Sequence, residues 1–147
     1  MRQDSVACGV LACQEELVLI HDGARCFIQK PEILNLLASL NNYGCATLAI
    51  PITDTIRMQE PNGCTLLDRT KLWAMQTPQA VSRSRYLEAY ELAKKDGFYG
   101  TDDVALLEHA FGIKPILVPG RSDNIKVTTA FDLEIAKTYF QGGKHEL

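Results

Sequence analysis

The sequence predicts an α/β domain whose sheet is mostly parallel and doubly wound. Two short apolar runs, at residues 17–21 and 46–50, are separated by a segment with helical periodicity. Nearly continuous apolar strands between helices are typical of parallel sheets covered on both faces. The Asn62-Gly63 pair then interrupts the alternation and predicts a β-hairpin in the middle of the chain.

The remaining elements follow from capping residues and from apolar spacing. A first helix is expected over residues 4–12, and Pro31 suits the first turn of a second helix that Gly44 ends. Five more elements complete the prediction. Ser82 caps a helix that runs to about Lys95, and Thr101 caps a helix over 102–111 that Gly112 ends. Short strands follow over 116–118 and 124–127, and a last helix is capped by Thr129 with Asp132 and stopped by Gly142-Gly143.

Length and charge narrow the class of protein. A chain of 147 residues suits one domain with a single core. Its formal net charge of −3 argues against a general nucleic-acid binder, which needs a basic surface. No apolar run approaches the roughly 20 residues that span a bilayer, and the first residues do not read as a signal peptide. We therefore expect no nucleic-acid or membrane partner and a cytoplasmic location, or the plastid stroma if the source organism has plastids.

The cysteines indicate a reducing compartment. There are five of them, and no two form a Cys-x-x-Cys pair. An odd count without paired spacing favours reduced thiols over a disulfide framework or a zinc site.

Residues 53–70 are expected to form a β-arm. The flanks of the Asn62-Gly63 turn carry too little apolar alternation to pack on a core. A two-stranded ribbon is marginal by itself in water, so we expect this arm to lean on a partner chain. The alternative is a solvated surface hairpin.

The segment His21-Asp22-Gly23-Ala24-Arg25 directly follows the first apolar strand. In open α/β sheets, ligands bind beyond the carboxyl ends of the strands. A carboxylate there can hold a ribose hydroxyl or a metal-bound phosphate, glycine allows close approach to the backbone, and arginine can bind phosphate with two donors. The segment predicts a sugar-phosphate or nucleotide site.

Three cations stand at the ends of predicted elements: Arg25, Arg69 and Lys126. Nucleotidyl transfer needs fixed positive charges that neutralise developing negative charge. Taken one at a time, each cation is explained more simply as a surface charge. Together with Asp22 and Thr55 they predict an anion site.

Other polar positions have plainer interpretations. His21 is a single histidine at a strand end, which favours a hydrogen-bonded structural role. The Asp102-Asp103 pair resembles a metal-binding pair, but helix capping explains it more simply. The Gln76-Thr77-Pro78-Gln79 segment fits a pocket lining and a rigid loop equally well.

Several of these motifs occur together in the order of one known family. They are His21-Asp22-Gly23-Ala24-Arg25, Thr53-Asp54-Thr55, Asp68-Arg69 with Leu72-Trp73, Gln76-Thr77-Pro78-Gln79, Thr101-Asp102-Asp103 and Asp123-Asn124-Ile125-Lys126-Val127-Thr128. The chain resembles the 2-C-methyl-D-erythritol 4-phosphate cytidylyltransferases of the non-mevalonate isoprenoid pathway, from about residue 4 to residue 140. Each motif alone is weak, and their order and spacing carry the resemblance.

The resemblance implies a Rossmann-like nucleotidyltransferase. Its reaction joins CTP to the polyol phosphate and gives 4-diphosphocytidyl-2-C-methyl-D-erythritol and pyrophosphate, with Mg²⁺ held mainly by the CTP phosphates. It also implies a homodimer whose arms interlock, so that residues of one arm serve the neighbour's site. The implied roles are catalytic for Arg69 and Lys126, substrate-binding for Thr55, Arg25 and Asp22, and nucleotide-binding for Ser5, Gly23 and Asp22; no protein metal ligand is assigned.

One part of the family pattern is missing. Family members begin with a strand and a glycine-rich loop that carries an arginine and a lysine and wraps the triphosphate, and this sequence has no such loop. We therefore expect residues 1–147 to be a single partial domain, truncated at the N-terminus, with impaired activity alone. Gly23, where the family often has alanine, is a mild departure.

Two other functions stay open on sequence grounds. One is a cytidylyltransferase for another polyol phosphate such as ribitol 5-phosphate, which shares the segments around Asp22 and Lys126. The other is a catalytically dead dimerisation or binding fragment, which keeps the arm without CTP affinity.

Overall fold

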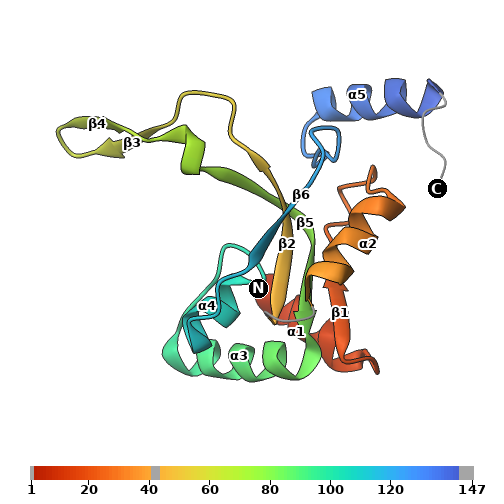
Figure 1. The fold of residues 1–147 in the computed structure, drawn as a ribbon, viewed down its shortest axis with the longest axis vertical. Coiled ribbons are helices and arrows are strands. Elements are labelled where there is room, and N and C mark those ends of the chain that lie inside the picture. Colours follow the sequence, from red (N-terminus) through yellow and green to blue (C-terminus); the bar gives the residue numbers. More distant parts are fainter. Residues whose placement is uncertain (1, 41–43, 143–147) are drawn as a thin grey trace.

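The computed structural model describes residues 2–40 and 44–142, and shows a four-stranded sheet with a separate two-stranded arm (Figure 1). The helices are α1 (Arg2–Ala12), α2 (Lys30–Ser39), the short 3₁₀ helix η2 (Arg69–Lys71), α3 (Arg83–Asp96), α4 (Ala105–Phe111) and α5 (Ala130–Gln141). The strands are β1 (Leu17–Ile20), β2 (Cys45–Pro51), β3 (Arg57–Glu60), β4 (Gly63–Leu66), β5 (Trp73–Ser82) and β6 (Ile116–Pro119).

The sheet is mixed, so the prediction of a mostly parallel sheet is wrong. Its strand order is β1-β5-β2-β6, and β5 runs antiparallel to both of its neighbours. Among the described strands, the β2–β6 pair is parallel. Strands β1, β2 and β6 do share one direction, and the inserted β5 makes the sheet mixed.

The sequence does not predict strand β5, because the residues in its middle are typical of a loop. Pro78 lacks a backbone N–H and is rare in central strands. The pairing of β2 with β5 shifts between Thr47 and Ala49, opposite this proline, so the ladder is interrupted where the donor is missing. Polar residues beside Pro78 further hide the strand, although Gln76 and Gln79 are both buried.

Helices cover both faces of the sheet, as predicted. One apolar cluster joins α1, α3 and α4 to the sheet, with Tyr86 and Val81 at its centre. The other joins α2 to the opposite face through Leu36 and Ala80. Because successive side chains of a strand point to opposite faces, the neighbours Ala80 and Val81 serve different clusters.

The helix caps confirm part of the prediction. The side chains of Ser82 and Thr129 accept backbone N–H groups at the starts of α3 and α5. The Thr101 cap is wrong, because α4 begins only at Ala105, whose N–H is bonded by the Asp102 carboxylate at 2.9 Å.

The remaining differences lie near the C-terminus. The strand expected over 124–127 is wrong, because this stretch is a loop. The Asn124 side chain donates to the Thr77 carbonyl of β5, and its carbonyl accepts from Arg25 in another loop. The helix stop predicted at Gly142-Gly143 falls partly outside the described residues, since α5 ends at Gln141 and Gly143 is not among them.

The arm and α5 both project from one end of the sheet (Figure 1). The β-hairpin prediction is confirmed over β3 and β4, which pair antiparallel, and all of their residues are exposed. Helix α5 is attached through Phe27, whose ring lies 4.8 Å from that of Tyr139 and 5.1 Å from that of Phe140.

Candidate functional site

A polar cavity of about 350 Å³ opens beside the end of β1. We call it the cleft. Its lining residues are Arg2, Asp22, Arg25, Met75, Gln76, Thr77, Gln79, Thr101, Asp102 and Lys126. They come from α1, from β5 and from three loops, so the cleft exists only because the sheet brings these segments together.

Asp22 is the electrostatic centre of the cleft. Lys126 Nζ lies 3.0 Å from its Oδ2, Arg25 Nε lies 3.7 Å from the same oxygen, and Arg2 Nη2 lies 3.8 Å from Oδ1. Burial acts to raise the pKa of Asp22, but the three neighbouring cations outweigh it and keep that pKa below its ordinary value. Asp22 is therefore a carboxylate at neutral pH.

The cations exceed the carboxylate that they surround. Arg2 is already held by Asp103, through a bidentate pair at 2.9 and 2.6 Å. Arg25 and Lys126 share Asp22, so positive charge exceeds negative charge locally around Asp22, while Asp102 supplies a carboxylate elsewhere in the lining. A phosphate suits such a place, because charge-assisted hydrogen bonds to phosphate oxygens are among the strongest in proteins.

Arg25 is locked in place by backbone oxygens. Its Nη1 donates to the carbonyl of Asn124 at 2.7 Å, and its Nη2 donates to that of Met75 at 3.5 Å. Burial lowers the pKa of Arg25, an effect that Asp22 opposes, and a guanidinium stays charged regardless. Lys126 pairs with Asp22, and 46% of its side-chain surface is exposed, so a ligand in the cleft can reach it.

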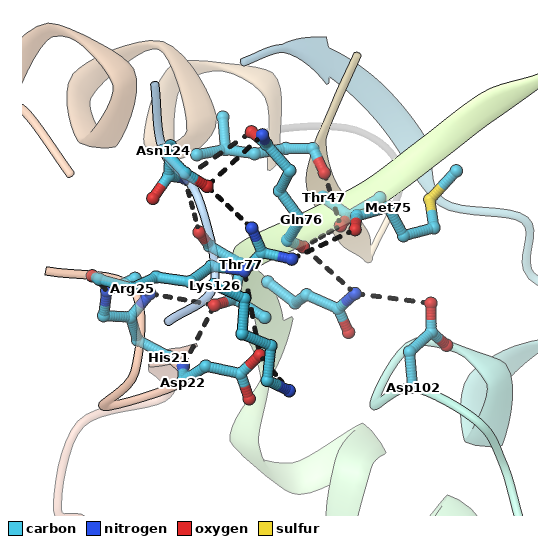
Figure 2. Close-up of polar contacts among 12 residues, drawn as sticks. His21, Asp22, Arg25, Thr47, Met75, Gln76, Thr77, Asp102, Asn124 and Lys126 are labelled. Atoms are coloured by element: carbon cyan, nitrogen blue, oxygen red, sulfur yellow. Dashed lines mark hydrogen bonds and ion pairs between the residues drawn. The ribbon is translucent and has the colours of Figure 1, made fainter. Parts of the chain in front are cut away.

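The structure brings together three of the predicted site residues, Asp22, Arg25 and Lys126, which converge in Figure 2. The other four lie outside the lining of the cleft. Arg69 and Thr55 stand at the base of the arm, where Arg69 Nη1 donates to the Thr53 carbonyl at 2.5 Å.

Ser5 and Gly23 are exposed near the cleft without lining it. Ser5 lies on α1, the helix that also supplies Arg2, and Gly23 lies in the loop between Asp22 and Arg25. Their nucleotide-binding roles stay predictions.

Two of the plainer interpretations are confirmed. The two ring nitrogens of His21 bond to the Arg25 carbonyl at 2.9 Å and to Thr77 Oγ1 at 3.0 Å, which is a structural role. Asp102 caps α4 through the Ala105 N–H. Asp103, its neighbour, is almost fully buried and holds Arg2 instead.

Sequence reasoning missed Arg2 and Asn124. Arg2 stands near the start of the chain and meets its carboxylate partner 101 residues away, a separation at which no spacing rule applies. Asn124 is fully buried, and in the sequence it looked like part of a strand. Its place within Asp123-Asn124-Ile125-Lys126 was the available signal, because an amide beside a candidate site lysine can anchor the loop.

Residues 2–40 and 44–142 offer neither a metal-binding cluster nor a membrane span. They hold no group of three or more histidine, cysteine, aspartate or glutamate side chains placed to bind a metal ion. Within the same residues, every helix is too short or too polar to cross a lipid bilayer.

Comparison with known proteins decides the family. The IspD family model, 2-C-methyl-D-erythritol 4-phosphate cytidylyltransferase, matches residues 1–142. The chain belongs to this family. A relative of the same description from Bacillus pumilus is 44% identical over 138 residues, which make up 92% of this chain and 60% of the relative.

Solved structures of the family share the fold. The 2-C-methyl-D-erythritol 4-phosphate cytidylyltransferase from Thermus thermophilus has a TM-score of 0.86 and 30% identity, covering 96% of this chain and 70% of that chain. The 4-diphosphocytidyl-2C-methyl-D-erythritol synthase from Anaerococcus prevotii has a TM-score of 0.87 and 31% identity, covering 96% of this chain and 64% of that chain. The present chain thus spans about 60 to 64% of the length of the curated relatives from Bacillus pumilus and Shouchella clausii.

Proposed function

We propose that this chain forms the phosphate-binding part of a cytidylyltransferase, which transfers the cytidylyl group of CTP to 2-C-methyl-D-erythritol 4-phosphate. One observation carries the proposal: Asp22, Arg25 and Lys126 meet in one cleft of a chain that belongs to this family. The reaction fits the cytoplasmic location predicted from the sequence.

The chemistry asks the protein mainly for positive charge and for alignment. An oxygen of the polyol phosphate attacks the α-phosphorus of CTP, a new P–O bond forms, and the bond to the departing pyrophosphate breaks. Two anions must approach each other, so fixed cations lower the barrier. Lys126 and Arg25 would bind the polyol phosphate, while Asp22, Ser5 and Gly23 would lie toward the nucleotide.

Magnesium belongs to the same proposal. Enzyme-bound Mg²⁺ is usually held by one or two carboxylates together with substrate phosphates. Two cleft carboxylates, Asp22 and Asp102, are compatible with an ion that arrives on CTP and is held mainly by its phosphates. When bound, the ion would neutralise charge on the triphosphate.

The arm suggests a homodimer. Its strands are fully exposed in a single chain, although a lone two-stranded ribbon is marginal in water. We propose that the arm packs on a second copy and that Arg69 and Thr55 complete the neighbour's cleft. Arg69 would then act as the second catalytic cation beside Lys126.

The test uses a fusion, because the relatives are longer than this chain. The N-terminal part of the Bacillus pumilus relative is joined to these 147 residues, and pyrophosphate release is measured with CTP, Mg²⁺ and 2-C-methyl-D-erythritol 4-phosphate. We expect turnover by the fusion and weak or no turnover by the 147-residue chain alone. Preference for ribitol 5-phosphate in direct competition would overturn the proposed substrate. A folded fusion without turnover would overturn the proposal that the protein is a cytidylyltransferase.

Lys126→Met in the fusion tests the role of the cleft. Loss of one donor that stabilises transition-state charge costs about 10²–10³-fold in kcat. The matched control is Lys114→Met, since Lys114 is also exposed but precedes β6 outside the cleft. Equal activity of the two variants would remove Lys126 from the mechanism.

A further inference from the structure

Three side chains in the middle of β5 are polar and yet buried. Gln76, Thr77 and Gln79 are only 4%, 6% and 1% exposed. Each of them bonds to a different loop beside the cleft. We call these loops the first (residues 21–25), the second (residues 101–104) and the third (residues 120–126).

Gln76 anchors the third loop. Its Nε2 donates to the Arg121 carbonyl at 2.8 Å. Asn124 Nδ2, from the same loop, donates to the Thr77 carbonyl of β5 at 3.0 Å (Figure 2). The fit is close, because a Cβ at Gly120 would collide with Gln76 Oε1 and stand 3.3 Å from its Cδ. The third loop carries Lys126, so the bond from Gln76 fixes the position of the Lys126 backbone.

The first loop is tied both to Thr77 and to the third loop. The Asp22 N–H donates to Thr77 Oγ1 at 2.9 Å. Arg25 Nη1 donates to the Asn124 carbonyl at 2.7 Å, and the Val127 N–H donates to the Ala24 carbonyl at 2.8 Å. Any shift of the third loop therefore moves the cations around Asp22.

Gln79 anchors the second loop. Its Oε1 accepts the N–H groups of Asp103 at 2.9 Å and of Val104 at 3.2 Å. Its Nε2 donates to Asp102 Oδ2 at 3.3 Å, on the opposite wall of the cleft from Lys126 (Figure 2). The second loop is thus held by Gln79, and the third loop by Gln76.

We propose that Gln76 and Gln79 are positioning residues, each of which sets one wall of the cleft through its own side-chain amide. The two are linked by one long bond, from Gln79 Nε2 to the backbone carbonyl of Gln76 at 3.4 Å, and that carbonyl also accepts from Thr47 Oγ1 at 3.2 Å. Gln76 places Lys126 and Arg25 around Asp22, and Gln79 places Asp102. A buried amide suits this task, because it supplies a donor and an acceptor at fixed positions and leaving a loop N–H or carbonyl without a partner is costly. The inference goes beyond the proposed function, since it concerns the cleft whatever ligand binds there.

The test compares Gln76→Met with Gln79→Met in the fusion of these 147 residues with the N-terminal part of the Bacillus pumilus relative. Both changes keep the approximate length of the side chain and remove its hydrogen bonds. We expect Gln76→Met to raise the pKa of Asp22 toward its ordinary value, measured by ¹³C NMR of the carboxyl group, and to weaken binding of inorganic phosphate at least tenfold. We expect Gln79→Met to leave both unchanged and to speed hydrogen exchange of the Asp103 and Val104 amides at least tenfold. Gln14→Met, at an exposed position between α1 and β1, should change none of these readouts.

Two results would overturn the inference. Either both variants disturb both walls to the same extent, as general loosening of the core would, or neither variant changes its own wall. If a Met variant does not fold, a second variant replaces it. Gln79→Glu keeps the acceptor and should preserve protection of Asp103 and Val104 while it repels Asp102; loss of that protection would count against the inference. Gln76→Leu loses the donor to Arg121 without adding a charge and should still raise the Asp22 pKa, and no rise would count against it. None of these readouts requires turnover, so this inference and the proposed function can fail separately.

Discussion

Gly120 and Gly23 both lie beside the cleft, and they differ in the room around their α-carbons. A Cβ at Gly120 would collide with Gln76 Oε1 and approach the Ala49 carbonyl to 3.5 Å. At Gly23, no described atom outside Gly23 and its two chain neighbours lies within 4 Å of that position. Neither residue has a positive φ. Crowding, and not the backbone conformation, therefore separates the two sites.

We predict that Gly120→Ala destabilises the fold by about 1–3 kcal/mol, the usual cost of forcing atoms into a packed site. Gly23→Ala should leave stability unchanged or raise it by up to about 1 kcal/mol, because alanine restricts the unfolded chain. Urea unfolding of the two variants checks both values. Equal costs would show that Gln76 yields easily to the added methyl group.

At the scale of elements, α5 depends on its N-terminal cap. The Asp132 carboxylate accepts the N–H of Thr128 at 3.0 Å and that of Thr129 at 2.8 Å, while Thr129 Oγ1 accepts the Asp132 N–H at 3.1 Å. These bonds favour the ionised form and lower the pKa of Asp132 to about 2.

The cap gives α5 a predictable dependence on pH. Because the folded pKa of Asp132 lies below its ordinary value, its stabilising effect is complete above about pH 4 and is lost as the pH falls toward 2. NMR should show increasing exchange of the α5 amides across that window. In Asp132→Asn the window should vanish, and its persistence would point to another titrating group.

The arm does not pack against the four-stranded sheet. Met58 and Leu66 are 50% and 59% exposed on its two strands. Their apolar surface has no cover within the described part of the chain, which fits a ribbon that packs on a partner.

We predict that Leu66→Asp weakens self-association of the chain by at least tenfold, since burying a charge in an apolar contact is costly. Sedimentation of the fusion with the N-terminal part of the Bacillus pumilus relative, over a range of concentrations, measures the effect. The control is Leu92→Asp, on the exposed side of α3 and away from the arm. If the unmodified fusion is a monomer at all accessible concentrations, the proposed dimer is wrong.

At the scale of the whole molecule, exposed apolar side chains lie on α1, on α5 and on the edge strand β1. Leu11 on α1 is 63% exposed, and Phe131 and Phe140 on α5 are 73% and 53% exposed. A larger, mostly apolar groove of about 510 Å³ lies along α5. Strand β1 forms one edge of the four-stranded sheet, and its Leu17 is 44% exposed.

We therefore predict that the 147-residue polypeptide alone is marginally stable or prone to aggregate, because large apolar patches and open strand edges favour association. It should bind the dye ANS and sediment as a mixture of species. A cooperative thermal transition in a monodisperse sample that does not bind ANS would contradict this prediction.

Local patterns were enough to predict the family and much of the local structure. Ser82 and Thr129 cap their helices as expected, because a cap is a bond between residues three apart. Asp22, Arg25 and Lys126 lie together in the cleft, and the short loop 21–25 and the order of the motifs pointed to this grouping. Arg69 and Thr55, which were expected with them, lie at the base of the arm, and the roles of all five stay predictions. The Asn62-Gly63 pair predicted the β3–β4 hairpin.

The place of β5 and the inner wall of the cleft could only come from tertiary contacts. Pro78 and its polar neighbours read as a loop until β1 and β2 enclose them. Arg2 bonds to Asp103, 101 residues away, and Gln76 bonds to Arg121, 45 residues away. Periodicity and capping report on neighbours along the chain, whereas a buried amide or ion pair is stable only when distant segments remove water from both partners together.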